Sequence, residues 1–301
     1  MFARLVPGPM VRWFARPYVA GDSMESALDV AASLHADHDL LASLDLLGED
    51  VHRQSEVDAT VGVYERLIDA VAADARYAGA RQRPSVSLKP SAFTTGAIEA
   101  VRDPVRALAR RAHERGIALT IDMEDRRWTD LTIDVTVELF KEGIDVGTVL
   151  QTRLHRTEAD LEKIPEGMRL RLVIGIYNEP ADIALTAKRP MKERMLAYAR
   201  KLLDRNVFVE FGTHDEEFLE RFVKEVAPAA PDRCEIQMIY GVPRRKITQR
   251  LKAGEFGIVL PLRKYVPFAE GWTSATAYLR RRMEESPSTM WLVLRNLLSR
   301  R

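Results

Sequence analysis

The pattern of apolar and polar positions divides the chain into two parts. From Ser23 to Ala73 apolar residues recur at helical spacing, Ser23 is placed as an N-cap, and Ala and Leu are frequent. From residue 85 onward, short apolar runs alternate with longer amphipathic stretches. We therefore expect a helical lead-in over residues 1–80, packed in one structural unit on a strand-and-helix body over residues 81–301.

The apolar runs of the second part have the length of strands, and helical patterns separate them. The predicted strands are Ser85–Leu88, Ala118–Met123, Val146–Gln151, Leu170–Tyr177, Val207–Gly212, Glu235–Tyr240 and Ile258–Leu262. The predicted helices include Val101–Arg115, Leu131–Glu142, Met191–Asp204, Glu216–Val226 and Arg244–Ala253. Apolar strands with helical crossovers are typical of a parallel sheet covered by helices. The sequence therefore predicts an α/β protein.

The number of strand–helix units favours a closed (β/α)8 barrel over an open doubly wound sheet. No strand end carries a Gly-x-Gly-x-x-Gly loop, and no Walker A sequence occurs. A Rossmann dinucleotide site and a P-loop are therefore not expected.

Composition narrows the classes of partner. The 45 basic and 44 acidic residues nearly cancel, so no nucleic-acid partner is expected. Cys234 is the only cysteine, which excludes an internal disulfide and a thiolate metal cluster, and no His-Glu-x-x-His motif supplies another metal site. No apolar run reaches the roughly 18 residues that a membrane span needs. We expect a cytoplasmic protein that binds small molecules and no metal.

Both chain termini combine basic and apolar residues. The segment 1–20 contains Arg4, Arg12 and Arg16 among aromatic and aliphatic residues, and 291–301 is an apolar helix candidate with basic flanks. Either segment can pack on the core, pair with another subunit or contact lipid. A peripheral contact with the inner face of the cell membrane and an oligomer therefore stay open. So does a non-catalytic barrel that binds an anionic metabolite or a membrane surface.

A cluster of arginines near the C-terminus has the spacing that is most informative about a ligand site. If 278–285 is helical, Arg281 and Arg282 lie three and four residues after Tyr278 and share a broad face with it. Two guanidinium groups beside a phenol are a receptor for a carboxylate. The alternative is a solvated basic face, in which Arg280 pairs with Glu284 and Arg281 with Glu285.

Polar residues end nearly every predicted strand, where the chemistry of a barrel gathers. They are Lys89, Asp122, Glu124, Asp125, Gln151, Arg153, Arg171, Tyr177, Thr213, His214, Asp215, Gln237, Tyr240, Arg263, Lys264 and Tyr265. Each also has a structural interpretation: Arg171 can pair with a neighbouring carboxylate, Asp122 can orient a lysine, and His214 can be a satisfied helix-entry residue. Together they predict a cationic, aromatic pocket with few general bases, which suits an anionic substrate beside an electron-poor or phosphate-bearing cofactor.

Motifs in this order resemble those of the proline dehydrogenase family, in its short, monofunctional bacterial form. The motifs are Leu46-Leu47-Gly48-Glu49, Ser87 to Lys89, Ile121 to Asp125, Val149 to Gln151, Arg171 to Tyr177, Gly212 to Asp215, Gln237 to Gly241, Tyr265 to Phe268 and Tyr278 to Arg282. Each motif alone is weak, and their order makes the resemblance specific. It covers nearly all of the chain from about Gly21 onward.

The resemblance implies a distorted (β/α)8 barrel of the TIM type, with a C-terminal helix over the barrel mouth, that binds FAD non-covalently. Such an enzyme transfers hydride from L-proline to FAD, yields Δ1-pyrroline-5-carboxylate in the first step of proline catabolism, and passes the electrons to a quinone. The residues matching the family's substrate site are Lys89, Tyr177, Ile239, Tyr265, Tyr278, Arg281 and Arg282. The catalytic roles fall to Lys89, Asp122, Tyr265, Tyr278, Arg281 and Arg282, with Asp122 holding Lys89 or Arg282 in place.

The resemblance also implies the cofactor contacts and a gate. The residues matching the flavin site are Gln151, Arg171, Gly175, Ile176, Thr186, Lys188, Thr213, His214, Gln237 and Glu285, with Arg171 close to N5 and O4. Glu49 matches the residue that closes over bound substrate by pairing with Arg281.

The fourth predicted strand departs from the family pattern. The family usually reads Lys-Gly-Ala-Tyr where this chain has Ile174-Gly175-Ile176-Tyr177, and Asn178 replaces a larger or apolar residue. Ile176 adds bulk near substrate and flavin. An alternative is therefore an FAD-dependent dehydrogenase of another cyclic or secondary amino acid, such as hydroxyproline, pipecolate or an N-alkyl amino acid.

Overall fold

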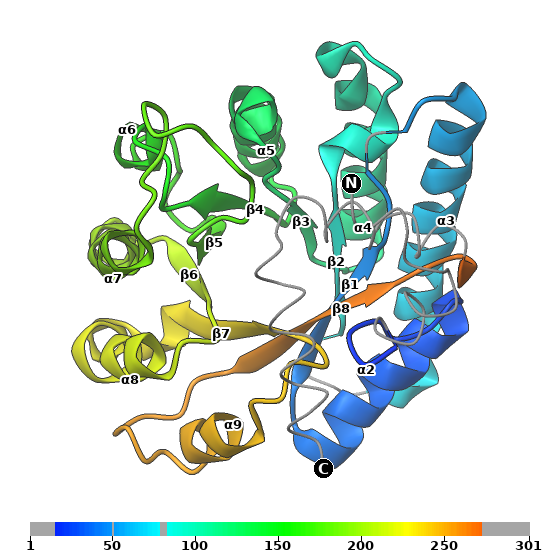
Figure 1. The fold of residues 1–301 in the computed structure, drawn as a ribbon. Helices are drawn as coiled ribbons and strands as arrows, with labels where there is room; N and C mark the ends of the chain where they lie inside the picture. Colours follow the sequence, from blue (N-terminus) through cyan, green and yellow to red (C-terminus); the bar gives the residue numbers. More distant parts are fainter. Residues whose placement is uncertain (1–15, 50, 79–82, 273–301) are drawn as a thin grey trace, which may run out of the picture.

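The fold is a closed barrel of parallel strands. The computed structural model describes residues 16–49, 51–78 and 83–272. Within them the strands pair in chain order from β1 to β8, and β8 closes the barrel by pairing with β1 (Figure 1). The strands are β1 Leu41–Leu46, β2 Ser85–Leu88, β3 Leu119–Ile121, β4 Val146–Gln151, β5 Arg169–Val173, β6 Phe208–Gly212, β7 Cys234–Ile239 and β8 Leu262–Phe268. The (β/α)8 prediction is confirmed.

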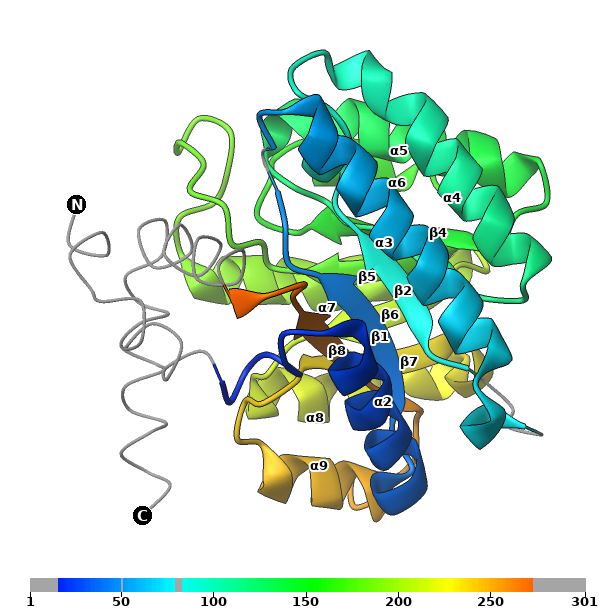
Figure 2. The same ribbon diagram turned by 90° about the vertical axis from the view of Figure 1, so that its right-hand side faces the viewer.

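Helices form a ring around the barrel (Figure 1). They are α2 Met24–His38, α3 Gln54–Ala73, α4 Arg102–Glu114, α5 Thr129–Lys141, α6 Thr157–Leu161, α7 Lys188–Asp204, α8 Glu216–Glu225 and α9 Arg245–Lys252. Short 3-10 turns lie at Ala75–Tyr77, Pro90–Phe93, Ile98–Val101, Arg126–Trp128, Ala227–Ala229 and Pro231–Arg233. From the side, α2 and α3 lie along the outside of the first strands (Figure 2). In the described part, no helix is both long and apolar enough to cross a bilayer.

The pleat of the strands separates an apolar layer from a polar one. In β5, Leu170 and Leu172 are fully buried in the core between strands and helices. Arg169 and Arg171 alternate with them and bond to residues of other strands across the barrel interior. The core of this protein therefore lies mainly between the sheet and the helices, and charged side chains fill much of the barrel.

Most of the predicted elements are confirmed. The strands Ser85–Leu88 and Val146–Gln151 have the predicted bounds. The strands predicted at Ala118–Met123, Leu170–Tyr177, Val207–Gly212 and Glu235–Tyr240 exist with ends shifted by a few residues. The five predicted helices are present. Ser23 caps α2 as predicted, because its side chain accepts a hydrogen bond from the backbone N–H of Ser26 at 3.2 Å.

The last predicted strand was wrong. Ile258–Leu260 lies in a turn and coil segment, and β8 begins at Leu262. Arg263, Lys264 and Tyr265 are therefore strand residues and do not follow the strand. The apolar run gave a false signal because Val259 is 62% exposed, whereas Arg263 can enter the strand because Glu235 neutralises it inside the barrel.

The helical prediction for Ser23–Ala73 was wrong over one segment. Leu41–Leu46 forms β1, which pairs with both β2 and β8, so a barrel strand lies inside the expected lead-in. Asp39 ends α2 in the left-handed conformation with φ 48°. Ala and Leu favour helices, but helix propensity is a weak preference, and strand pairing on two sides outweighs it here. The predicted helix over the barrel mouth and most of both terminal segments lie outside the described residues.

Candidate functional site

A buried ion pair joins the carboxyl ends of the first two strands. The Lys89 ammonium, directly after β2, donates to both carboxylate oxygens of Asp45 at 2.5 and 2.6 Å. Burial raises the pKa of Asp45 to about 6, although Lys89 opposes the shift. The pair fixes Lys89 at the barrel mouth. Sequence reasoning missed Asp45, whose only signal was an acid inside the apolar run Leu44 to Leu47.

Asp122, after β3, connects two other predicted site residues. Its carboxylate accepts from Arg171 Nη1 at 2.7 Å and from the Tyr265 hydroxyl at 2.6 Å. Lys89 donates to the same Tyr265 hydroxyl at 3.3 Å. Burial, together with the charges of Asp122 and Asp45, raises the pKa of Tyr265 well above its usual value, so the phenol keeps its proton. The carboxylate that holds Lys89 is thus Asp45, and Asp122 instead orients Arg171 and Tyr265.

Arg171 lies at the centre of this network. Its guanidinium donates to Gln237 Oε1 at 2.5 Å, to Asp122 at 2.7 Å and to Ser87 Oγ at 3.3 Å, and it lies 5.2 Å from the centre of the Tyr265 ring. The structural interpretation of Arg171, pairing with a neighbouring carboxylate, is therefore confirmed. A fixed, buried cation also remains available to an electron-rich group at the mouth.

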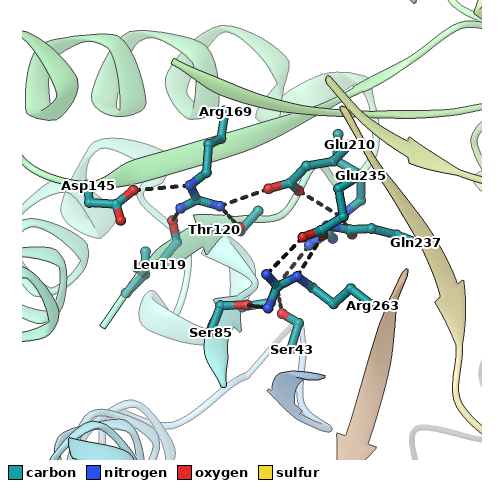
Figure 3. Close-up of polar contacts among 12 residues, drawn as sticks. Ser43, Ser85, Leu119, Thr120, Asp145, Arg169, Glu210, Glu235, Gln237 and Arg263 are labelled. Carbon is teal, nitrogen blue, oxygen red and sulfur yellow. Dashed lines mark hydrogen bonds and ion pairs between the residues drawn. The ribbon is translucent and has the colours of Figure 1, made fainter. Parts of the chain in front are cut away.

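Further ion pairs lie inside the barrel (Figure 3). Arg169 donates to Glu210 at 2.9 Å and to Asp145 at 3.0 Å. Arg263 binds Glu235 with two bonds of 2.7 and 2.9 Å. Buried charges are costly without partners, so each interior cation needs a carboxylate nearby. Sequence reasoning did not predict Glu210 or Glu235, because these partners come from different strands.

Gln151 and Gly175 approach each other closely beside this network. Gln151 Nε2 donates to the backbone oxygen of Glu124 at 2.8 Å. Gln151 Oε1 is buried and has no hydrogen-bond partner among the described residues. Gly175 has φ 94°, and a Cβ there would lie 2.4 Å from Gln151 Oε1. Only glycine fits, and Gln151 Oε1 can accept a bond from a bound molecule.

His214, after β6, has a second buried side-chain atom without a hydrogen-bond partner among the described residues. Its Nε2 lies 3.0 Å from the backbone N–H of Ile239. Burial, with smaller contributions from Lys264 and Arg244, lowers the pKa of His214 to about 4, so the ring is neutral at neutral pH. Because Nε2 must then accept the bond, the proton lies on Nδ1. That nitrogen is buried without a partner in the described part, and it can donate to a ligand.

The remaining predicted site residues are more dispersed. The backbone oxygen of Tyr177 accepts a bond from Arg153, Glu49 is buried, and Thr213 Oγ1 accepts from the N–H of Asp215. Ile176 and Ile239 expose 58% and 46% of their surface, which is unusual for large apolar side chains here. Thr186 and Lys188 are exposed at the start of α7.

Part of the predicted site lies outside the described residues: Tyr278, Arg281, Arg282 and Glu285. Of the others, the structure brings Lys89, Asp122, Arg171, Gln237 and Tyr265 into one bonded network. It joins Gln151 to Gly175, and His214 to Ile239, in two further pairs. Among the described residues no group of three or more His, Cys, Asp and Glu could hold a metal ion.

Comparison with known proteins points to one family. The sequence profile described as proline dehydrogenase matches residues 27–290. Proline dehydrogenase of Deinococcus radiodurans is 31% identical over 94% of this chain and 90% of its own length. Proline dehydrogenase 1 of Bacillus subtilis strain 168 is 29% identical over 95% of this chain and 91% of its own.

Solved structures share the fold. The chain superposes on proline utilization A (PutA) from Bdellovibrio bacteriovorus, a structure described as inactivated by N-propargylglycine, with a TM-score of 0.76 and 22% identity. PutA from Bradyrhizobium japonicum gives 0.72 and 20%. These matches cover 92% and 90% of this chain but only 33% and 31% of the PutA chains. With its barrel, its strand-end network and a family match over most of its length, the chain belongs to the proline dehydrogenase family and is an oxidoreductase.

Proposed function

We propose that this protein binds FAD non-covalently, oxidises L-proline to Δ1-pyrroline-5-carboxylate, and delivers the electrons to a quinone. The observation that carries the proposal is the buried Arg171 guanidinium, fixed at the barrel mouth by Asp122 and Gln237 in a chain of the proline dehydrogenase family. When bound, the flavin supplies a hydride acceptor whose reduced form is electron-rich. A fixed cation beside it favours that form.

The residues at the mouth fit a flavin. Gln151 offers a buried acceptor and His214 a buried donor, and each lacks a partner among the described residues. Gly175 has no side chain at a point where a Cβ would collide with Gln151. Ile176 and Ile239 present apolar surface that a ring system can cover. Contacts to the rest of FAD are assigned to Thr186, Lys188, Thr213 and Glu285.

The substrate carboxylate is assigned to Arg281 and Arg282, with Tyr278 and Lys89 beside them. Because Asp45 neutralises Lys89, most of the attraction for the anion must come from the two arginines. Tyr265, Tyr177 and Ile239 shape the space for the ring, and Glu49 closes over it. We place this chemistry in the cytoplasm, with a peripheral contact at the membrane where the quinone resides.

The reaction needs little proton transfer by the protein. Hydride leaves the carbon next to nitrogen only if the nitrogen lone pair is available, so the neutral amine reacts. The residues of this chain then mainly orient the ring, and orientation can supply much of the rate enhancement. Lys89, Arg171 and Tyr265 are all held by bonds to buried carboxylates, which limits their movement.

Purified protein tests the cofactor and the reaction. It should release FAD on denaturation, convert L-proline to Δ1-pyrroline-5-carboxylate detectable by mass spectrometry, and reduce a soluble quinone. Protein that contains no flavin, or that leaves proline unchanged, would contradict the proposal. Hydroxyproline and pipecolate belong in the same assay, because the exposed β-branched Ile176 replaces alanine in the family pattern.

The proposed carboxylate site at Arg281 and Arg282 has a matched control in the neighbouring Arg280. Replacing Arg281 or Arg282 by Met should raise the KM for proline by about tenfold to a hundredfold, the effect of losing a charge-assisted pair. Flavin content should stay unchanged. Arg280→Met removes the same charge one position away and should leave KM within about twofold. Equal effects at Arg280 and Arg281 would refute the receptor.

A further inference from the structure

The side-chain amide of Gln237 links two charged groups inside the barrel. Gln237 Oε1 accepts from Arg171 Nε at 2.5 Å, and Gln237 Nε2 donates to Glu235 Oε1 at 2.8 Å. Both residues belong to β7 and are buried, with 4% of Gln237 and 2% of Glu235 exposed. Figure 3 shows the amide with Glu235 above Arg263. Both ends of Gln237 therefore already have protein partners.

Glu235 decides which end of the amide faces Arg171. A glutamine can turn its amide over and exchange donor for acceptor, but an ionised carboxylate only accepts. With Glu235 charged, Nε2 must point to it, and Oε1 must point to Arg171. The reverse orientation would place two acceptors together at Glu235 and two donors together at Arg171. Glu235 thus determines that Gln237 accepts a hydrogen bond from Arg171, although Glu235 is not a partner in that bond.

Arg263 in turn keeps Glu235 charged and in place. It donates to both carboxylate oxygens of Glu235, and its Nη1 also donates to the backbone oxygen of Ala42 at 2.9 Å and to Ser85 Oγ at 3.2 Å. These bonds tie Glu235 to β1, β2 and β8. The orientation of the Gln237 amide is therefore determined by contacts in the barrel interior, and not by residues at the barrel mouth.

The hydrogen bond from Arg171 to Gln237 helps to determine the orientation of the Arg171 guanidinium. Its hydrogen bonds to Gln237, Asp122 and Ser87 use Nε–H and one N–H on each terminal nitrogen. A guanidinium has five N–H groups, so two remain for a ligand. Loss of the Gln237 bond would let the planar group rotate about its stem and turn those two donors away.

We propose that Glu235 is a positioning residue: through the amide of Gln237 it holds the guanidinium of Arg171 in the orientation that stabilises reduced flavin. This inference rests on the proposed function. It makes Glu235 and Gln237 determinants of the flavin reduction potential although neither contacts the substrate. In this role Gln237 acts through Arg171.

The first test does not require flavin. The Arg171 Nε–H can be observed by nitrogen-15 NMR of arginine-labelled protein and assigned by its loss in Arg171→Lys. Glu235→Gln and Gln237→Met should both shift this resonance and speed its exchange with solvent by about tenfold, as expected for loss of one charge-assisted bond. Ser85→Ala is the control, because it removes a buried bond of Arg263 but leaves the Glu235, Gln237 and Arg171 contacts.

The second test measures the reduction potential of the bound flavin. In Glu235→Gln and in Gln237→Met the reduced form should lose about tenfold of its stabilisation, which moves a two-electron potential about 30 mV more negative. The double variant should change no more than the larger single effect, since both act on one bond. Ser85→Ala should keep the wild-type potential.

The outcomes separate this inference from the function on which it rests. Wild-type protein without flavin would contradict the proposed function, while the NMR test of Glu235 would still decide whether it holds Arg171. An unchanged Arg171 resonance in Gln237→Met would overturn the inference, and so would a lower melting temperature in Glu235→Gln with an unchanged potential. If Glu235→Gln fails to fold, Glu235→Gln combined with Arg263→Met removes the carboxylate without leaving Arg263 unpaired. Its Arg171 resonance and flavin potential then give the answer.

Discussion

At the scale of single residues, Asp45 determines the electrostatic state of Lys89. The two form a pair with exposures of only 1% and 7%. The attraction in such a pair mainly repays the cost of burying both charges, so the pair adds little stability by itself. Removing one partner is different, because the other charge then stays buried without compensation.

Asp45→Asn should therefore destabilise the protein by about 3 to 5 kcal/mol, measured as the free energy of unfolding in urea. The double variant Asp45→Asn with Lys89→Met should recover most of that loss, because no charge is left behind. Asp145→Asn is the control: Asp145 pairs with Arg169 but is 57% exposed, and it should cost less than about 1 kcal/mol. Equal losses at Asp45 and Asp145 would contradict this account.

The sequence identified the residues of the mouth better than their partners. Lys89 and Asp122 directly follow β2 and β3, and Arg171, Gln237 and Tyr265 lie within β5, β7 and β8; a polar residue in or beside an apolar run is the signal that marks them. Their bonds run between strands far apart in the chain, so no local spacing predicts Asp45 for Lys89. The same holds for the pairing of Arg263 with Glu235.

At the scale of elements, the loop after β5 needs a glycine for two separate reasons. Gly175 has φ 94°, which strains any other residue, and a Cβ there would also lie 2.8 Å from Arg153 Cδ and 2.4 Å from Gln151 Oε1. Gly143 has a similar φ of 86° but nothing within 4 Å of its added Cβ. Substitutions at these two glycines therefore distinguish the effect of backbone strain, which both share, from the effect of crowding, which only Gly175 has.

Gly143→Ala should lower the free energy of unfolding by about 1 kcal/mol, from strain alone. Gly175→Ala should cost about 1 to 3 kcal/mol more and reduce flavin content, because Gln151 must move. Thermal unfolding and the ratio of flavin to protein measure the two effects. If both variants lose equal stability and both retain flavin, Gly175 does not hold Gln151 in place.

Six of the eight strands were predictable from their apolar runs, including β5, β6 and β7, which also carry charged side chains, but β1 and β8 were not. β4 reads as a continuous apolar run, but β8 places Arg263 and Tyr265 inside the barrel, and β1 has the composition of a helix. These two strands pair with each other over their whole overlap. Such pairing is a long-range property, and hydrophobic periodicity does not contain it.

At the scale of the whole molecule, a buried carboxyl group makes stability depend on pH. Burial raises the pKa of Glu124 from 4.5 to about 7, against the bonds from the hydroxyl and N–H of Ser91. The folded state therefore binds more protons than the unfolded state between about pH 4.5 and 7. The contribution of Glu124 to stability therefore falls as pH rises through this window, whereas His214, whose pKa is lowered to about 4, contributes with the opposite sign.

Glu124→Gln should remove this contribution, roughly 3 kcal/mol in all, when unfolding in urea is followed from pH 4.5 to 8 in both proteins. An amide can still accept from the N–H of Ser91 and donate to its hydroxyl, so the fold should persist. Part of the pH dependence should remain, because burial also raises the pKa of Asp45 to about 6. Glu255→Gln, at a half-exposed ion pair with Arg250, should leave the pH dependence unchanged. A difference in stability between wild type and Glu124→Gln that does not change with pH would contradict the assignment.

The central claim is that this barrel is a flavin enzyme that takes hydride from proline. An anaerobic titration with L-proline, followed by visible absorption, tests it most directly. We predict that the purified protein shows the absorption bands of oxidised flavin, that L-proline bleaches them, and that a quinone restores them. Protein without those bands, or with bands that L-proline leaves unchanged, would contradict the claim.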